Sequence, residues 1–329
     1  MLQTAFTTLL NIDHPIVQGP LGPATTPELA AAVSNAGGLG SLSAVLLPAD
    51  VLRAQIDRAR ELTDKPFAVN HILNQFDREA FDTTLEARPA VISFALGDPA
   101  ELVHEAHAAG SLVMQQVVSV ASAYEAAKRG VDVIIAQGSE AGGNTGLIAT
   151  LPLVPQVVNA VEPIPVLAAG GIADGRGLAA MLALGAQGVN VGTRFLASLE
   201  AASDDAWRAA IVQAGSGDIV KFTPWNGAFP PAGGDYYTIP SSVRNEFIEA
   251  WLARERENEV DHGQLRREIL AAAQERRFGA TVPLAGQSSG LIDEVLPARQ
   301  IIETMVAEAE AALTEAWQTA YAGLVPTGS

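Results

Sequence analysis

The chain has no cysteine among its 329 residues. This absence excludes disulfide bonds, zinc–thiolate sites and a cysteine nucleophile. Aromatic residues make up only 5% of the sequence, whereas alanine and glycine are plentiful, and such small side chains suit close packing of helices on a sheet. Apolar runs are also short: none approaches the roughly 20 residues that a membrane-spanning helix needs, so we expect no membrane partner.

Positive charge is scarce as well. The 20 lysine and arginine residues are outnumbered by 37 aspartate and glutamate residues, which gives a formal net charge of −17. This charge repels polyanions, so it argues against nucleic acid and an anionic membrane surface as partners. Residues 1–11 lack the basic start and the long apolar run of a signal peptide, so we expect a cytoplasmic protein.

What the chain does contain is a regular alternation of short apolar runs and amphipathic, alanine-rich segments. The apolar runs are residues 15–18, 38–43, 67–72, 91–96, 112–118, 131–137, 165–169 and 188–191. Helical patterns follow at residues 27–36, 49–61, 77–87, 99–109, 121–128, 152–160, 175–184 and 204–214. Apolar strands joined by helices indicate a parallel sheet covered on both faces. Eight such units predict an α/β fold of the closed (β/α)₈ TIM-barrel type, with a doubly wound open sheet as the alternative.

The pattern changes after about residue 220. We predict that residues 1–220 and 284–329 form the barrel domain, and that residues 221–283 form a helical cap over the barrel mouth, inserted before a C-terminal helix at 297–321. The cap carries Trp225, Phe229, Tyr236 and Tyr237, which either line a substrate pocket or pack within the cap.

Two glycine-rich turns carry the strongest local signal. Gly170 and Gly171 follow the seventh apolar run, and Gly192 and Thr193 follow the eighth. In a TIM barrel this pair of loops is the usual phosphate site. Glycines let backbone N–H groups approach an anion, and the N-terminus of the following helix adds a favourable dipole. We therefore expect one phosphate group at this rim, although a Gly-Gly pair can also serve only to turn the chain.

The ligand that carries this phosphate is predicted by elimination. The sequence has neither a Rossmann glycine fingerprint after an N-terminal strand nor a Walker A lysine. A mononucleotide such as FMN fits a single phosphate site at a barrel mouth. Amide side chains at strand ends could address the isoalloxazine edge, and the candidates by position are Gln18, Asn70, Gln115 and Gln116; for each of them alone, capping of a strand end is an equally good interpretation.

Several longer segments point to one family. They are residues 14–20 (HPIVQGP), 30–40 (AAAVSNAGGLG), 67–70 (FAVN), 138–143 (GSEAGG), 168–178 (AAGGIADGRGL), 188–198 (GVNVGTRFLAS) and 286–290 (GQSSG). Together they resemble the nitronate monooxygenase (2-nitropropane dioxygenase-like) family of FMN-dependent TIM-barrel oxidoreductases. The match covers most of the chain outside the cap. It is less specific for the reaction, because quinone reductases and enoyl-thioester reductases look much the same.

The resemblance implies a set of residues that bind FMN without a covalent link. It implies Gln18, Asn70 and Gln116 at the flavin ring and Gly142 and Gly143 near the ribityl-phosphate region. It implies Gly170, Gly171, Gly192 and Thr193 at the phosphate, and Gln287, Ser288 and Gly290 closing the pocket.

One position departs from the family pattern. The glycine-rich loop of the family typically reads E-A-G-G-H, with the histidine as catalytic base, whereas this chain has Asn144 there. An amide does not titrate near neutral pH, but it can donate a hydrogen bond to a nitro, carbonyl or quinone oxygen. His71 is the other histidine predicted at the barrel mouth, as a substitute base or substrate anchor, unless it turns aside. His104 and His107 share a helix face without a third ligand, so we expect no metal.

Three functions remain open at this point. The first is a nitronate monooxygenase that uses O₂ to convert a small-molecule nitronate to a carbonyl compound and nitrite, since a nitronate is already deprotonated and needs no base. The second is an FMN-dependent NAD(P)H reductase of quinones or enoyl thioesters. The third is a flavin-binding protein without catalytic activity. The exposed helices of a barrel are also compatible with a homodimer.

Overall fold

Eight parallel strands form one sheet at the centre of the molecule. The computed structural model describes residues 2–230, 238–275 and 277–321. The strands follow the spatial order β1-β9-β8-β6-β5-β4-β3-β2. Their bounds are β1 (Ile16–Gln18), β2 (Gly40–Ser43), β3 (Phe67–Ile72), β4 (Val91–Ala95), β5 (Leu112–Val117), β6 (Val133–Gln137), β8 (Val166–Ala169) and β9 (Gly188–Val191).

The two edges of this sheet meet between β1 and β2. The backbone N–H of Gln18 donates to the carbonyl oxygen of Leu39 at 2.9 Å, and the N–H of Leu39 donates to the carbonyl oxygen of Ile16 at 2.9 Å. These bonds, with the parallel bridge between Val17 and Leu39, join the sheet into a ring. The predicted eight-stranded barrel is confirmed, and each strand lies within one of the predicted apolar runs.

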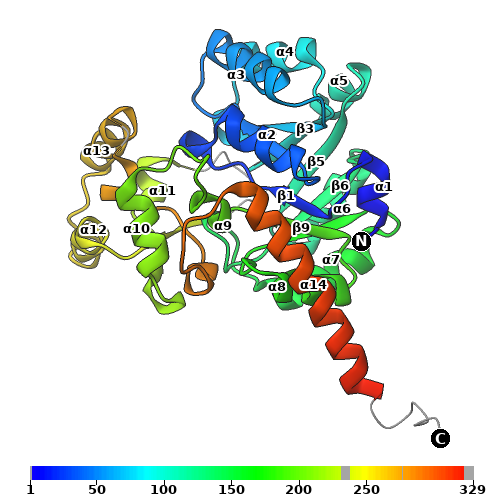
Figure 1. Cartoon of the computed structure of the whole chain (residues 1–329). Helices are drawn as coiled ribbons and strands as arrows, with labels where there is room; N and C mark the ends of the chain where they lie inside the picture. Colours follow the sequence, from blue (N-terminus) through cyan, green and yellow to red (C-terminus); the bar gives the residue numbers. More distant parts are fainter. Residues whose placement is uncertain (1, 231–237, 276, 322–329) are drawn as a thin grey trace, which may run out of the picture.

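Helices surround the ring (Figure 1). Seven of them follow barrel strands: α2 (Pro27–Asn35), α3 (Ala49–Leu62), α4 (Arg78–Ala87), α5 (Leu102–Ala108), α6 (Val120–Lys128), α7 (Thr150–Val161) and α8 (Gly175–Ala183). Their starts are fixed locally, because Thr26, Asp77, Ser119 and Asp174 each accept a backbone N–H from three residues further on. Such capping satisfies backbone donors that have no partner within the helix.

The eighth position around the barrel is filled from the far end of the sequence. The long helix α14 (Ala298–Tyr321) packs against α8 and α2, and its far end projects beyond the body of the barrel (Figure 1). Contact with α8 is so close that a Cβ on Gly175 would lie 2.4 Å from the backbone nitrogen of Ala309. The segment predicted as the eighth barrel helix, α10 (Asp205–Gln213), instead joins the apolar cluster of the cap, so that assignment was wrong.

The barrel interior changes character along its axis. At the N-terminal ends of the strands it is apolar, with Val17, Leu39, Ala68 and Met114 among its residues. The short helix α1 (Ala5–Leu10) adds Phe6 and Leu10 to this cluster. Further along the strands, buried polar side chains replace the apolar ones: Ser41, Asn70, Ser93, Gln137 and Asn190. The polar end is the C-terminal end, where TIM barrels place their active sites.

Residues 221–283, predicted as a helical cap, contain more than helices. The helices are α11 (Trp225–Ala228), α12 (Glu246–Arg256) and α13 (His262–Gln274), and they lie together with α10 on one side of the barrel (Figure 1). A three-stranded antiparallel sheet, in the order β10-β11-β7, joins this part to the barrel: β10 is Ile219–Lys221, β11 is Ile239–Val243 and β7 is Gly143–Thr145. The sequence did not reveal this sheet, because its strands are too short for a periodic pattern and Pro240 argues against a strand. The domain bounds at residues 220 and 283 stay a prediction.

Short elements complete the described chain. They are the four-residue helix α9 (Thr193–Leu196) and the 3₁₀ helices Gly22–Ala24, Leu73–Gln75, Ser216–Asp218, Phe278–Ala280 and Gln287–Leu291. Within the described ranges, no helix combines the length and the apolarity that a bilayer crossing requires.

Candidate functional site

A pocket lies at the polar end of the barrel. Its walls come from the ends of β5, β6, β8 and β9 and from the loops that follow β1, β6 and β8. Its enclosed volume is about 200 Å³, and about 870 Å³ of empty space is reached only when the part open to solvent is counted. Ligand pockets of proteins commonly enclose about 300–1,000 Å³. A cofactor or substrate of ordinary size would therefore occupy the enclosed part and extend into the open part.

Both predicted phosphate turns border this pocket. Gly170 and Gly171 have φ angles of +104° and +75°, which L-residues with a side chain rarely adopt. Gly192 and Thr193 lie on the neighbouring strand end and line the same space. Thr193 Oγ1 accepts the N–H of Gly286 at 3.0 Å, a bond that does not use its hydroxyl hydrogen.

The helix that follows Gly170–Gly171 is α8, and its N-terminus was expected to face the phosphate. The N–H groups that begin α8 are already bound: Gly175 donates to Glu308 Oε2 at 2.8 Å, and Gly177 donates to Asp174 Oδ1 at 2.9 Å. The N-terminus of α8 is therefore filled by carboxylates of the protein itself. The helix end at the pocket is that of α9, whose first residue is Thr193.

The glycine-rich loop after β6 forms the wall next to the Gly170–Gly171 turn, since a Cβ on Gly170 would lie 3.0 Å from the backbone nitrogen of Ala141. Gly142 and Gly143 both line the pocket. A Cβ on Gly142 would lie 2.8 Å from the carbonyl carbon of Ala285, so the tail segment packs directly on this loop. The N–H of Gln287 donates to the carbonyl oxygen of Glu140 at 2.8 Å, and the Glu140 carboxylate accepts the Thr150 N–H at 2.9 Å. The loop is thus tied on both sides.

Three amide side chains line the pocket. Gln116 Nε2 donates to Gln137 Oε1 at 3.1 Å, across the neighbouring strands β5 and β6. Asn190 lies on β9, and its Oδ1 atom is buried without a hydrogen-bond partner within the described residues. A buried acceptor without a partner is costly, so such an atom marks a place where a ligand donor is wanted. Sequence analysis predicted Gln116 as a contact but missed Gln137 and Asn190. Asn190 faces the pocket, whereas its neighbours Val189 and Val191 are not among the lining residues.

Several predicted ring contacts lie outside the pocket lining. Gln18 is fully buried, and its Oε1 accepts the N–H of Ser41 at 2.9 Å while its Nε2 donates to the carbonyl oxygen of Gly19. Asn70 Nδ2 donates to Ser93 Oγ at 2.9 Å. Both amides therefore bind within the barrel in this structure.

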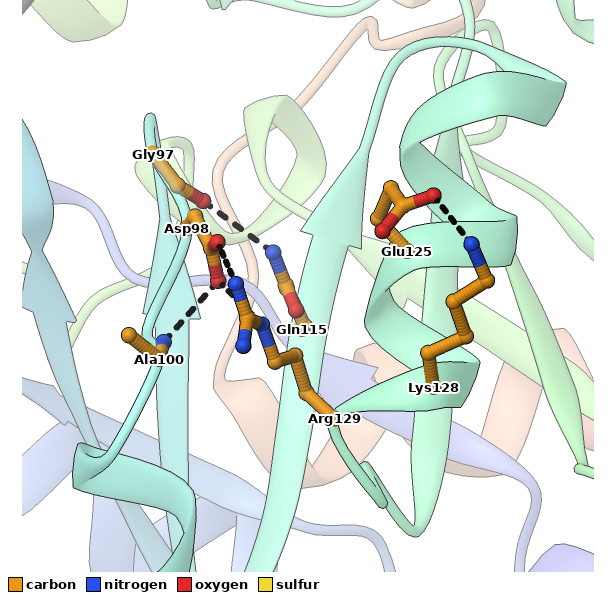
Figure 2. A network of polar contacts seen from close by, with 7 residues as sticks. All are labelled: Gly97, Asp98, Ala100, Gln115, Glu125, Lys128 and Arg129. Carbon is orange, nitrogen blue, oxygen red and sulfur yellow. Dashed lines mark hydrogen bonds and ion pairs between the residues drawn. The ribbon is translucent and has the colours of Figure 1, made fainter.

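Gln115 illustrates how strand alternation separates neighbours. Its side chain points away from the pocket and donates to the carbonyl oxygen of Gly97 at 3.1 Å, beside the ion pair of Asp98 with Arg129 (Figure 2). The adjacent Gln116 points to the pocket instead. Successive side chains of a strand face opposite sides of the sheet, so only one of the two amides can reach a ligand.

The tail segment contributes one of its three predicted residues to the pocket lining. Ser288 is buried and lines the pocket. The side chain of Gln287 is exposed, and its backbone carbonyl accepts Ser216 Oγ at 2.8 Å. Gly290 packs against Ser216, where a Cβ would come within 2.6 Å of Oγ. Gln287 and Gly290 thus support the wall from behind.

The structure does not place His71 at the barrel mouth. The imidazole is buried between the barrel and the helices, 5.3 Å from the ring of Phe81 and 6.4 Å from that of Phe94. The hydroxyl of Thr84 donates its hydrogen to the carbonyl oxygen of Ala80. In the contact of 3.0 Å between His71 Nε2 and Thr84 Oγ1, the imidazole is therefore the donor. Burial lowers the pKa of His71 to about 4. His71 is a neutral core residue, because Asn70 takes the inward position on this strand.

Asn144 is held on the short strand β7. It pairs with Pro240 of β11 and is half-buried, and its side chain makes no hydrogen bond within the described residues. Its neighbour Gly143 lines the pocket, whereas Asn144 lies just beyond the lining. The amide therefore lies next to a pocket-lining residue, and no described residue uses its hydrogen-bonding groups.

Of the cap aromatics that the structure describes, Trp225 and Phe229 do not line the pocket. The rings of Trp225 and Phe229 lie 4.6 Å apart, and Arg266 stacks over Phe229 at 4.9 Å. Tyr236 and Tyr237 lie outside the described residues. Trp207 of α10 lines the pocket instead, with its Nε1 donating to the carbonyl oxygen of Leu284 at 3.0 Å.

Comparison with curated sequences finds two kinds of relative. A probable nitronate monooxygenase of Staphylococcus saprophyticus is 33% identical over 94% of this chain and 98% of its own. A (3aS,4S,5R,7aS)-5-hydroxy-7a-methyl-1-oxo-octahydro-1H-indene-4-carboxyl-CoA dehydrogenase of Rhodococcus jostii is 43% identical over 62% of this chain. The aligned part spans only 58% of the length of that dehydrogenase.

Comparison with solved structures gives the same fold over nearly the whole chain. FabK from Thermotoga maritima has a TM-score of 0.86 and 35% identity, and it covers 97% of this chain and 100% of its own. A nitroalkane oxidase of Streptomyces ansochromogenes has a TM-score of 0.82 and 29% identity, covering 95% and 100%. The sequence model of the family described as nitronate monooxygenase matches residues 3–82 and 76–308. With its barrel, its glycine turns and this match, the chain belongs to the nitronate monooxygenase family of flavin-dependent oxidoreductases.

Proposed function

We propose that the protein binds FMN in the barrel-mouth pocket and oxidises nitronates with O₂ to a carbonyl compound and nitrite. The supporting observation is the convergence of three glycine-bearing turns on one pocket: Gly142–Gly143, Gly170–Gly171 and Gly192. Backbone N–H groups at such turns suit a phosphate group, because no side chain stands between the amide and the anion.

The residues present fit this cofactor at the other end of the pocket as well. The isoalloxazine edge carries both donors and acceptors, and Gln116, Gln137 and Asn190 offer amides that can meet either kind of group. The unpartnered Oδ1 of Asn190 is suited to a ring N–H. Thr193 would donate its hydroxyl hydrogen to the phosphate, while its oxygen keeps the bond from Gly286.

The chemistry divides between the cofactor and the protein. FMN, when bound, would supply the redox chemistry between the nitronate and O₂, and the overall reaction balances when two nitronates and one O₂ give two carbonyl compounds and two nitrite ions. The protein binds and orients: the Asn144 amide would donate a hydrogen bond to an oxygen of the nitronate. A nitronate carries no proton that must be removed, so the absence of a titrating group at position 144 is compatible with this substrate and unfavourable for neutral nitroalkanes.

The second candidate is an NAD(P)H-dependent reductase of a quinone or an enoyl thioester. It is favoured by the partial match to a carboxyl-CoA dehydrogenase, whose name places a thioester of coenzyme A at the site of that relative. The same pocket would serve this reaction, with the Asn144 amide on a carbonyl oxygen. The two candidates differ in the compound that reduces the flavin, which is the nitronate in the first and NAD(P)H in the second. An experiment that offers each donor separately can therefore distinguish them.

The test mixes FMN-loaded protein anaerobically with a nitronate or with NADPH and follows flavin absorbance. We expect the nitronate to bleach the flavin and NADPH alone to be slow, followed by nitrite formation when O₂ is admitted. Fast bleaching by NADPH alone would establish the reductase instead. Bleaching by neither, with FMN bound, would contradict both and leave a flavin-binding protein.

Asn144→His tests the assignment of position 144. If the imidazole occupies the position of the family's base, the variant gains activity on neutral nitroalkanes, which Asn144→Ala as a matched control does not. Intact FMN binding without any gain would show that position 144 does not reach the substrate.

A further inference from the structure

Lys221 joins three segments around the pocket loop. Its Nζ donates to the carbonyl oxygen of Ser139 at 2.9 Å, to Ser241 Oγ at 2.9 Å and to Thr145 Oγ1. Ser139 and Thr145 lie on either side of Gly142, Gly143 and Asn144, and Ser241 lies on β11 of the cap. One ammonium group therefore ties both ends of the glycine-rich loop to the cap.

These contacts use the full capacity of the ammonium group. A protonated lysine has three N–H donors and no acceptor, and here three acceptors are within reach. The group is thus committed to the protein and does not serve as a free anion site for substrate. A neutral amine has only two N–H donors, so loss of the proton removes one of the three bonds.

The surroundings oppose the charge. β7 and β11 carry no titratable residue, and Glu140 on the loop is the charged group whose field favours the ammonium. Burial outweighs Glu140 and lowers the pKa of Lys221 to about 8. The three-bonded form therefore predominates at neutral pH and decreases as the pH rises through about 8.

Lys221 contacts Asn144 indirectly, because it binds Thr145, the next residue on strand β7. Adjacent side chains of a strand face opposite sides, so Lys221 holds Thr145 on one face of the β10-β11-β7 sheet while Asn144 projects from the other. Lys221 itself is absent from the pocket lining. Its hydrogen bond to Thr145 reaches the strand that carries Asn144, and this is the route by which it can influence the reaction.

We propose that Lys221 is a positioning residue, whose ammonium group holds the glycine-rich loop and its Asn144 in register with the pocket. The catalytic part of this proposal rests on the proposed function, because it needs Asn144 at the substrate. The structural part does not. A consequence is that the loop loosens in alkaline solution when Lys221 loses its proton.

The first experiment measures amide hydrogen exchange of residues 139–148 in the full chain at pH 7 and pH 9.5, corrected for intrinsic rates. We expect wild-type protection to fall about tenfold between the two pH values, as for loss of a charge-assisted hydrogen bond. In Lys221→Met, residues 139–148 should be unprotected at both pH values. In Lys221→Arg, whose side chain stays charged, their protection should not fall at pH 9.5. Lys128→Met is the matched control, because this exposed lysine pairs with Glu125 on α6, away from the loop (Figure 2).

The second experiment follows the rate of flavin reduction by a nitronate against pH. Wild type should show a decline with a midpoint near pH 8, and Lys221→Met should be slower at pH 7 without that decline, while its affinity for FMN is retained. Ser241→Ala, which removes one acceptor, should give an intermediate rate if the methionine variant fails to fold. Loop exchange and pH profile identical in wild type and Lys221→Met would overturn the proposal. If wild type is not reduced by nitronate at any pH, the proposed function fails, and the exchange experiment alone decides the role of Lys221.

Discussion

Gly19 and Asn190 face each other across the edge where β1 meets β9. A Cβ on Gly19 would lie 3.4 Å from both Oδ1 and Nδ2 of Asn190, so the loop after β1 fits against this amide without a side chain between them. The contact fixes Asn190 at the pocket, yet it provides no hydrogen donor for Oδ1. Within the described residues Oδ1 has no donor, so a bound ligand or an ordered water is suited to supply one.

Asn190→Leu should therefore weaken FMN binding. Loss of one hydrogen bond in a buried site corresponds to about tenfold in the dissociation constant. Fluorescence titration with FMN measures it. Asn74→Leu is the matched control, because Asn74 also has a buried, unpartnered Oδ1 but lies outside the pocket lining. Equal affinities for the two variants would remove Asn190 from the cofactor site.

A second prediction separates backbone strain from ligand binding. Gly171→Ala and Gly130→Ala both force a side chain onto a positive φ, +75° and +82°, and neither new Cβ meets an atom closer than 3.5 Å. Both variants should lose about 1 kcal/mol of unfolding free energy. Only Gly171 borders the pocket, so only Gly171→Ala should lose FMN affinity as well. Unfolding in urea and FMN titration are measured on the same samples.

A third prediction concerns pH and stability. Because the pKa of His71 is about 4 in the folded protein and about 6.5 when unfolded, the unfolded chain binds more protons between these values. Stability is then fully present above pH 6.5 and is lost as the pH falls toward 4, by about 3 kcal/mol from this group.

The comparison that checks it uses His71→Gln, which keeps an N–H donor for Thr84 but does not titrate. Its unfolding free energy should lack this part of the acid dependence, and its flavin reduction rate at pH 7 should match wild type, since His71 lies outside the pocket lining. A large loss of rate with FMN still bound would return His71 to the active site.

A fourth prediction tests the contact between α8 and α14. Gly175→Ala places a methyl group 2.4 Å from backbone atoms of Met305 and Ala309, which should cost about 3 kcal/mol of unfolding free energy. Gly177→Ala, in the same helix, meets Ile172 Cγ2 at 3.1 Å and otherwise has room, so its cost should be small, offset by the better helix propensity of alanine. Urea denaturation compares the pair, and equal stabilities would contradict the close packing of α14.

Local pattern explains what could be predicted. The apolar runs identified every barrel strand because a strand buried on both faces needs apolar residues throughout. The turn at Gly170–Gly171 was found because its positive φ angles restrict the residue type. Gly192 has a φ of −104° and room for a Cβ, so its turn was found from the sequence motif and not from a backbone restriction. The sequence also showed that Asn70 and His71, as neighbours on a strand, must face opposite sides of the sheet. It did not show which of the two points into the barrel.

The sequence by itself determined the barrel, the glycine turns and the loss of a titrating group at position 144, because each depends on the identity of neighbouring residues. Only the tertiary structure decided that α14 takes the eighth helix position around the barrel, and that Lys221 holds the glycine-rich loop. The Gly175–Glu308 bond joins residues 133 positions apart, and the Lys221–Ser139 bond joins residues 82 positions apart. Such contacts leave no periodic trace along the chain, because they are set by where folding brings two distant segments.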